Sequence, residues 1–274
     1  MTKVLFSNQL PSKIVSRAFL QELANFVLEN EKQSQSGSLS VALVGKEEIR
    51  KLKREFFGED RYTDVISFNY GLTEKDSIWG EIVISLPVAE EQARERNIPV
   101  KEEVSYLFIH GLLHLLGYED SDPESKKVMT ERAKSLLAEF GKFQARKSLI
   151  KKAEKARALA YAPYSRFQVG AAIAGREGEV FTGCNIENAS FGLTVCAERV
   201  ALWKGVSAGV RDFSRIAIIS TSSQLCLPCG ACRQVLYQFS PGIEVVATRV
   251  DGSYQCFSLK ELFAFPFTLS SEEE

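Results

Sequence analysis

Hydrophobic residues recur with two different periods along the first half of the chain. Residues 15–31 carry apolar side chains every three to four positions, as an amphipathic helix does. The β-branched or aromatic runs 64–71 and 80–87, bounded by Gly or Pro, predict strands, and 39–49 predicts a strand that leads into a helix. Further helices are predicted over 88–97, 103–116 and 123–140.

The second half alternates regularly between helical and strand-like segments. It opens with a basic helix over 146–162 that ends before Pro163. Strands are predicted at 168–175, 178–186, 215–221 and 243–250, with helices that begin near 196 and 229. This alternation is typical of a layered α/β domain.

The chain is long enough for two domains, since 274 residues exceed the roughly 100–200 of a single domain. Pro123 can start the charged helix before Gly141, and Gly141 is placed to end it. We therefore predict two domains, 1–141 and 142–274, with no linker. The expected fold class is α+β for the first and α/β/α for the second.

Composition narrows the classes of protein. Hydrophobic residues at 45% and charged residues at 25% are ordinary globular values, which exclude collagen, coiled coils and disordered chains. No apolar run approaches the ~20 residues of a membrane span, and the first residues carry no export signal, so we expect a cytoplasmic protein without a membrane partner. With a net charge of -1, the chain has no general basic field that would attract nucleic acid.

Histidine and cysteine are completely separated along the chain. Both histidines, His110 and His114, precede residue 141, and all six cysteines follow it. Two disjoint sets of metal-ligand residues indicate two separate sites. Without an export signal, the cysteines predict thiolate chemistry rather than disulfides.

The cysteines cluster at the predicted starts of two helices. Cys196 precedes one helix, and Cys229 and Cys232 begin the other in the run CGAC. Free backbone N–H groups at a helix start favour the thiolate form that zinc requires. A site of three thiolates leaves a fourth position for water, whose pKa zinc can lower to about 7.

Charged residues beside the cysteines supply the rest of a reaction site. Glu198 lies two residues after Cys196 and can take and return a proton. Arg199, three residues after Cys196, and Arg233, directly after Cys232, are candidates to compensate the thiolate charge. A structural zinc site with four thiolates is the alternative. Its fourth ligand would be Cys226 or Cys184, whereas we expect Cys184 and Cys256 to be buried, inert thiols.

The motifs GCNIENASFG, TVCAERVAL and PCGACRQV, together with the stretch 163–167, resemble the short zinc-dependent cytidine deaminases over 145–274. The resemblance implies zinc on the three cysteines, proton transfer by Glu198, and Arg199 bonded to the thiolates. It also implies a homotetramer that shares residues between sites. The substrate-binding residues it implies are Phe167, Asn185, Glu187 and Ala197, with Phe267 near the C-terminus as a candidate lid and Ala264 where a proline is usual.

His110 and His114 lie four residues apart on an apolar helix, so both imidazoles share one face. Gly111 follows the first histidine, which excludes the HExxH pattern of metalloproteases. Such a pair is at least as often a hydrogen-bonded core pair as a metal site. Asp120, six residues after His114, is a candidate third ligand, because carboxylates also bind zinc.

The segments TDVISF, GEIVIS and HGLLHLLGYED resemble the rRNA maturation factor family (endoribonuclease YbeY) over most of 1–141. The resemblance implies a zinc-type metal, an rRNA or ribosome partner, and processing of single-stranded RNA. Two departures stand out. Asp120 replaces the third histidine, and Phe57 replaces the arginine expected to hold phosphate. A structural or RNA-positioning remnant without cleavage activity is the competing interpretation.

Together these features predict a cytidine deaminase fused to a YbeY-like domain. The predicted reaction converts cytidine or deoxycytidine to the uridine nucleoside and ammonia, a step of pyrimidine salvage. One alternative is deamination of cytosine within RNA, with the first domain presenting a single strand. The other is a non-catalytic, ribosome-associated module in which both metals serve folding.

Overall fold

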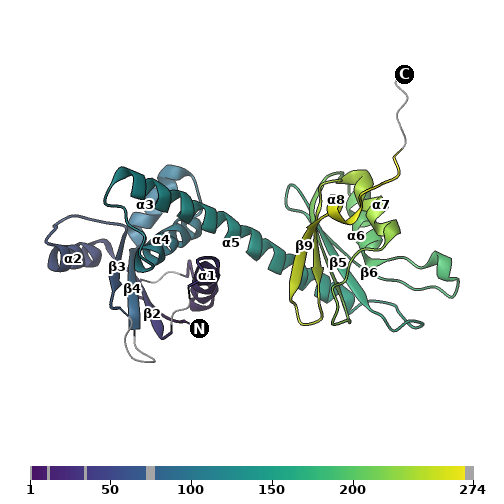
Figure 1. Ribbon diagram of the computed structural model, residues 1–274, viewed down its shortest axis with the longest axis horizontal. Helices are drawn as coiled ribbons and strands as arrows, with labels where there is room; N and C mark the ends of the chain where they lie inside the picture. The colour runs from purple at the N-terminus through teal and green to yellow at the C-terminus, as the bar shows by residue number, and fades with distance from the viewer. Residues whose placement is uncertain (1, 11–12, 34–35, 72–77, 269–274) are drawn as a thin grey trace, which may run out of the picture. The chain divides into compact units, whose positions relative to one another are not determined.

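The computed structural model describes residues 2–10, 13–33, 36–71 and 78–268 (Figure 1). The chain divides into two compact units, Met1–Lys142 and Phe143–Glu274. Each unit holds its own β-sheet. No helix in the described ranges is long and apolar enough to cross a bilayer.

The first unit contains a four-stranded sheet of order β1-β2-β4-β3. Strands β1 (Lys3–Asn8), β2 (Ser38–Val44) and β4 (Ile78–Ser85) are parallel, and β3 (Val65–Asn69) pairs antiparallel with β4. The sequence pattern did not predict β1. Strand β3 stands at the free edge of the sheet and contacts helix α4.

Four helices precede α5 in this unit: α1 (Arg17–Asn30), α2 (Lys46–Phe57), α3 (Leu86–Arg96) and α4 (Val100–Leu115). Ser16 caps α1 by accepting a hydrogen bond from the Phe19 N–H at 3.2 Å. The face that α1 buries follows the helical period predicted from the sequence and consists of Leu20, Leu23, Ala24, Val27 and Leu28.

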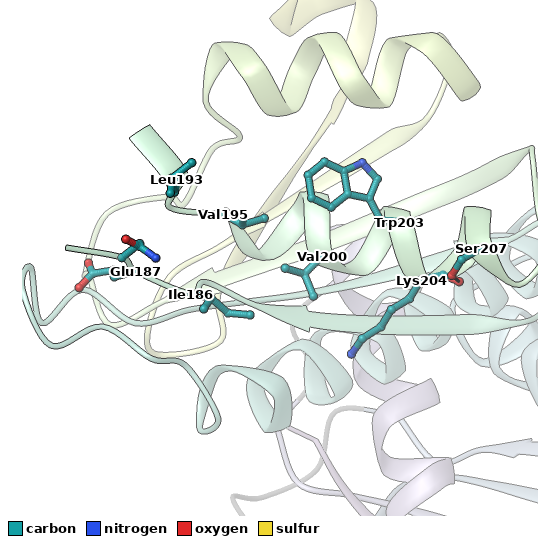
Figure 2. Close-up of a pocket in the computed structure, with 9 residues that line it drawn as sticks. Ile186, Glu187, Leu193, Val195, Val200, Trp203, Lys204 and Ser207 are labelled. Atoms are coloured by element: carbon teal, nitrogen blue, oxygen red, sulfur yellow. Dashed lines mark hydrogen bonds between the residues drawn. The ribbon is translucent and has the colours of Figure 1, made fainter. Parts of the chain in front are cut away.

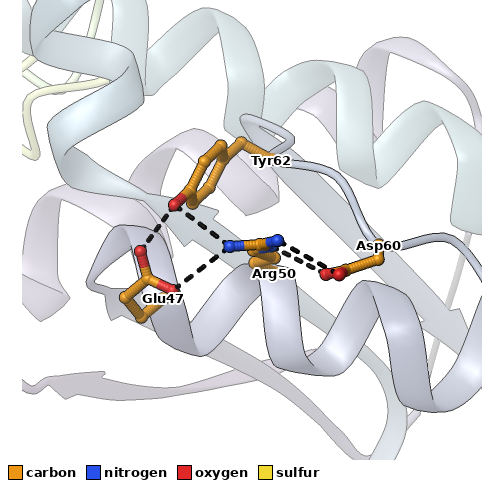
Figure 3. A network of polar contacts seen from close by, with 4 residues as sticks. All are labelled: Glu47, Arg50, Asp60 and Tyr62. Carbon is orange, nitrogen blue, oxygen red and sulfur yellow. Dashed lines mark hydrogen bonds and ion pairs between the residues drawn. The ribbon is translucent and has the colours of Figure 1, made fainter.

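A surface network joins α2 to the segment before β3 (Figure 3). Arg50 on α2 forms a two-bond ion pair with Asp60, the shorter bond being 2.7 Å long. The Tyr62 hydroxyl donates to Glu47 at 2.6 Å, and the Arg50 guanidinium lies over the Tyr62 ring. These side chains are largely exposed, so the network orients this segment rather than forming part of the core.

Helix α4 approaches β3 unusually closely at Gly111. A Cβ atom at this position would lie 2.8 Å from Ser67 Oγ and 2.9 Å from Ile82 Cγ2. The Ser67 hydroxyl donates to the Gly111 carbonyl at 3.1 Å, which fixes the contact. Only glycine permits this approach, which explains why a glycine follows His110. Gly117, at φ 94°, ends the helix region as predicted.

Helix α5 (Pro123–Arg157) is continuous, which contradicts the two separate helices predicted on either side of Gly141. Gly141 lies inside the helix and does not have a positive φ. A glycine in a helix interior costs about 1 kcal/mol relative to alanine, which packing elsewhere along the helix can offset. Met129, Ala133 and Leu136 are buried before it, and Leu149 and Ala153 after it.

The second unit contains a five-stranded sheet of order β6-β5-β7-β8-β9. Its strands are β5 (Val169–Gly175), β6 (Val180–Cys184), β7 (Phe213–Ser220), β8 (Glu244–Thr248) and β9 (Tyr254–Ser258). Only β7 and β8 are parallel neighbours. The sequence pattern missed β9, an edge strand, and the exposed Cys256 on it corrects the prediction of a buried thiol. Cys184 is half-buried.

Apolar side chains cover both faces of this sheet. One face packs against α6 (Ala197–Ser207) and α7 (Gly230–Phe239), and the other packs against the last part of α5. Two short elements complete the unit, η1 (Phe191–Leu193) and α8 (Leu259–Leu262).

Two glycines let helix backbones touch the strands of this sheet. A Cβ atom on Gly183 in β6 would lie 2.5 Å from the Ala197 carbonyl at the start of α6. A Cβ atom on Gly170 in β5 would lie 2.1 Å from the Ala153 carbonyl of α5. The contact at Gly183 sets the start of α6, and therefore the neighbouring Cys196, against the sheet.

Candidate metal centres

Three cysteines of the second unit meet at the starts of two helices. Cys196 is the N-cap of α6, Cys229 is the N-cap of α7, and Cys232 lies in the first turn of α7. These positions agree with the helix starts predicted from the sequence. The sulfur of Cys229 lies 3.8 Å from that of Cys196 and 3.5 Å from that of Cys232.

This spacing suits a metal ion rather than a disulfide. All cysteines are free, whereas bonded sulfurs would lie about 2.05 Å apart. Zn–S bonds of about 2.3 Å in a tetrahedron place the sulfurs about 3.8 Å apart. Among the described residues of the second unit, Cys196, Cys229 and Cys232 are the ones whose ligand atoms lie close enough together to hold one metal ion. Cys184 and Cys226, considered as fourth ligands, are outside it.

The surroundings of Cys196 favour its thiolate. Hydrogen bonds from Cys232 and Cys229, and then from Arg199, lower the pKa of the Cys196 thiol to about 5. The Arg199 guanidinium lies 3.9 Å from the Cys196 sulfur and donates to the Thr194 carbonyl at 2.9 Å. Arg199 thus has the position expected of a compensating cation. Arg233 instead donates to the carbonyls of residues 228 and 262.

Glu198 is buried beside the cysteines, with 5% of its surface exposed. Burial raises the pKa of its carboxyl to about 7, and the nearby Cys196 thiolate acts in the same direction. A carboxyl group with a pKa near neutrality can both accept and release a proton at neutral pH.

A cavity of about 220 Å³ opens onto Glu198 and two of the cysteines. Four other residues singled out in the sequence line it: Phe167, Asn185, Glu187 and Ala197. Sequence reasoning missed five further lining residues, Ser165, Val169, Thr194, Cys226 and Leu227. Ser165 and Thr194 lie inside quoted motifs, and Cys226 had been considered only as a zinc ligand, whereas Val169 and Leu227 carry no spacing that marks them.

The two polar residues expected to bind substrate also shape the cavity wall. Asn185 accepts a hydrogen bond from the Val169 N–H and donates to the Phe167 carbonyl, both at 2.8 Å. Glu187 accepts from the Tyr164 N–H at 2.8 Å and from the Ser165 hydroxyl, and the latter bond lowers the pKa of the Glu187 carboxyl. The Glu187 carboxylate is therefore charged and fixed at the rim of the cavity.

Phe267, the candidate lid, does not line this cavity. It lies by a separate hollow with Tyr237 and Pro241. Gln234 holds its backbone through two hydrogen bonds, of 2.8 and 2.9 Å, to the Phe267 carbonyl and N–H. The Phe267 side chain is 70% exposed.

An apolar groove lies beside the cavity (Figure 2). Val200 and Trp203 of α6 form one side, and Leu193 and Val195 come from the segment before this helix. Glu187 lines both the groove and the cavity. The rim of the cavity is therefore continuous with an exposed apolar surface.

The first unit holds a second cluster of possible ligands. One atom each from His110, His114 and Asp120 lie within 4.8 Å of one another. The His114 Nε2 atom lies 3.8 Å from Asp120 Oδ2, and the two imidazole rings are 4.8 Å apart. The structure thus brings together the three residues that the sequence suggested.

The hydrogen bonds of the histidines fit a metal site. His114 Nδ1 lies 3.1 Å from the Tyr118 carbonyl, which can only accept, so Nδ1 carries the proton and in the neutral ring the lone pair is on Nε2. His110 Nδ1 is buried without a hydrogen-bond partner among the described residues. Burial, followed by the neighbouring His114, lowers the pKa of His110, which keeps its ring neutral. Neutral imidazole is the form that binds metals.

Comparisons with known proteins match each unit separately. Residues 7–141 match the family model of endoribonuclease YbeY, and residues 144–248 match that of the cytidine and deoxycytidylate deaminase zinc-binding region. Cytidine deaminase from Halalkalibacterium halodurans is 48% identical over 124 residues, which are 45% of this chain and 94% of the relative. Endoribonuclease YbeY from a Sulfurihydrogenibium species is 35% identical over 130 residues, 46% of this chain and 85% of the relative.

A search of solved structures also returned cytidine deaminases. The crystal structure of the enzyme from Burkholderia pseudomallei is 46% identical, with a TM-score of 0.43. The match covers 44% of this chain and 97% of the other.

These matches define a fusion of two enzyme families. The chain belongs to the YbeY endoribonuclease family through its first part and to the cytidine and deoxycytidylate deaminase family through its second. Both resemblances inferred from the motifs are confirmed.

Proposed function

We propose that residues 142–274 catalyse the hydrolytic deamination of cytidine or deoxycytidine, a pyrimidine salvage reaction. One observation carries the proposal: three sulfurs spaced for a single zinc ion lie beside a buried carboxyl group, at a cavity of about 220 Å³. The relatives named cytidine deaminase support the choice of substrate.

The residues of the chain divide the chemistry between them. Zinc held by Cys196, Cys229 and Cys232 would supply a Lewis acid that makes a water molecule easier to deprotonate. Glu198 takes one proton from that water and delivers it to N3 of the ring, and then transfers the second proton of the same water from the C4 oxygen to the departing amino group. Water adds at C4, the C4–N4 bond breaks, and the products are the uridine nucleoside and ammonia. Arg199 offsets part of the thiolate charge.

The cavity wall positions the nucleoside. We assign the pyrimidine contact to Phe167 and Ala197, and the ribose 3′-hydroxyl to Asn185 and Glu187. The charged Glu187 carboxylate at the rim would accept a hydrogen bond from a free hydroxyl, whereas it would repel a 3′-phosphate. This feature favours free nucleosides over cytosine within RNA.

The choice between nucleoside and RNA is tested by assaying the zinc-loaded chain on two substrates. Free cytidine and a single-stranded oligonucleotide with internal cytosines are supplied at equal cytosine concentration. We expect ammonia release from cytidine and none from the oligonucleotide. Release from the oligonucleotide alone would instead establish RNA deamination and overturn the proposal.

For residues 1–141 we propose a metal-dependent role in rRNA maturation, with a zinc-type ion held by His110, His114 and Asp120. The lone pair of His114 Nε2 and the unpartnered Nδ1 of His110 fit such an ion. Phe57, in place of a phosphate-binding arginine, weakens the case for cleavage more than the case for metal binding.

The second metal is tested by measuring the metal content of the full chain. We expect two ions per chain for the wild type after zinc loading and one for His114→Ala, with deaminase activity unchanged. A content of one ion in both proteins would remove the metal from the proposal for this unit.

We also propose that the deaminase unit assembles as a homotetramer. The apolar groove of Figure 2 exposes 46% of Trp203 and 66% of Leu193, a surface typical of protein interfaces. Phe267 lies outside the cavity of its own chain, which suits a residue that covers the site of another copy.

A further inference from the structure

Three segments of the first unit converge on the carboxylate of Glu31. Glu31 directly follows α1, Arg132 lies on α5, and Tyr118 lies in the segment between α4 and α5. Arg132 Nε donates to Glu31 Oε1 at 2.7 Å, and the Tyr118 hydroxyl donates to Glu31 Oε2 at 2.8 Å. Each carboxylate oxygen therefore has its own donor.

The Glu31 contact is partly buried, unlike the exposed network around Arg50. The Glu31 side chain is 10% exposed and that of Arg132 is 29% exposed. Charge-assisted hydrogen bonds of this kind are stronger than neutral ones, and they fix geometry best where water is excluded.

Tyr118 links this carboxylate to the histidine cluster. Its carbonyl accepts the hydrogen bond from His114 Nδ1 at 3.1 Å, which sets the tautomer with the lone pair on Nε2. Asp120, two residues later, faces that Nε2 at 3.8 Å. The Asp120 side chain is 44% exposed, so it gains little from packing of its own.

We propose that Glu31 is a positioning residue for the His110, His114 and Asp120 cluster. By holding the Tyr118 hydroxyl, Glu31 fixes the segment that supplies both the carbonyl bonded to His114 and the carboxylate of Asp120. This inference rests on the metal binding proposed above for residues 1–141. Groups that orient a ligand in this way typically change metal affinity 10- to 100-fold when removed.

The test measures zinc affinity at the histidine cluster of the full chain by competition with a chelator, after the cysteine site has been filled. Glu31→Ala and Tyr118→Phe should each weaken binding about 10- to 100-fold. The double variant should bind no more weakly than the weaker single variant, because both changes break one connection. Glu139→Ala is the matched control, since Glu139 also pairs with Arg132, at 3.9 Å, whereas the Tyr118 hydroxyl donates to Glu31.

A second measurement separates positioning from general stability. The chain has only two histidines, so ¹H–¹⁵N spectra of the metal-free protein can report the tautomer of each, with His114→Ala for assignment. We expect a single Nδ1–H form of His114 in the wild type and in Glu139→Ala. In Glu31→Ala and Tyr118→Phe we expect a mixture of tautomers.

The outcomes separate this inference from the proposal on which it depends. If the wild type binds zinc at the cluster but Glu31→Ala and Tyr118→Phe retain its affinity and tautomer, Glu31 is not a positioning residue. If the wild type binds no second zinc, the metal proposal fails. The tautomer spectra then still decide whether Glu31 orients His114.

Discussion

Glu198→Gln is expected to lower kcat for cytidine by about 10²–10⁴-fold, the usual contribution of a general acid–base group. The amide keeps the size and the hydrogen-bonding atoms of the side chain, but it cannot accept a proton from water and return it to the substrate. The measurement is steady-state ammonia release from cytidine. Because no zinc ligand changes, KM should change less than kcat.

Three control measurements distinguish loss of catalysis from loss of zinc or of assembly. Glu198→Gln should retain one zinc ion at the cysteine site and the same mass in solution as the wild type, which we expect to be that of four chains. Glu177→Gln, an exposed change in the same unit, should retain full activity. Unchanged turnover in Glu198→Gln, or loss of its assembly, would favour the non-catalytic interpretation. A wild-type mass of one chain would contradict the tetramer.

Cys232→Ala is expected to remove both the zinc of the second unit and all measurable deamination. Cys232 is fully buried, and only two thiolates would remain for the ion. Structural zinc sites contribute on the order of 10–16 kcal/mol of binding free energy, so loss of a ligand should also lower the melting temperature of this unit. Zinc content, ammonia release and thermal unfolding measure the three effects.

Two other cysteines provide the controls for this experiment. Cys256→Ala, on the exposed edge strand β9, should leave zinc content and activity as in the wild type. Cys226→Ala should retain zinc, because its sulfur lies outside the ligand group. Loss of zinc in Cys226→Ala would instead support the alternative interpretation, a structural zinc site with four thiolate ligands.

The sequence was most informative where local rules govern structure. Cys196 and Cys229 each stand directly before a helix, and Glu198 follows two residues into the first of them, so short motifs place all three together. Gly117 follows the end of its helix as predicted, because glycine readily adopts the positive φ found there. Gly141 does not end its helix, because packing on both sides of it outweighs a modest helix preference.

Contacts between distant segments could not be predicted from any period or motif. Glu31 and Tyr118 are 87 positions apart, and no motif or periodicity in the sequence indicates that they are in contact. The cavity residues Val169 and Leu227 look like ordinary strand or loop residues until the fold brings them beside Glu198. Strands β1 and β9 were also missed, although β3 and β6, the other edge strands of the two sheets, were predicted.

The bare backbone of Gly170 bears on where a shortened deaminase could begin. The backbone of residues 153 and 157 of α5 lies directly against Gly170, because this position of the strand has no side chain. Cutting the chain after residue 157 would expose the apolar side chains of this sheet face to water, and no polar substitution on the sheet could replace a missing helix. An independently stable deaminase must therefore start before residue 149, within a helix that the other unit also uses.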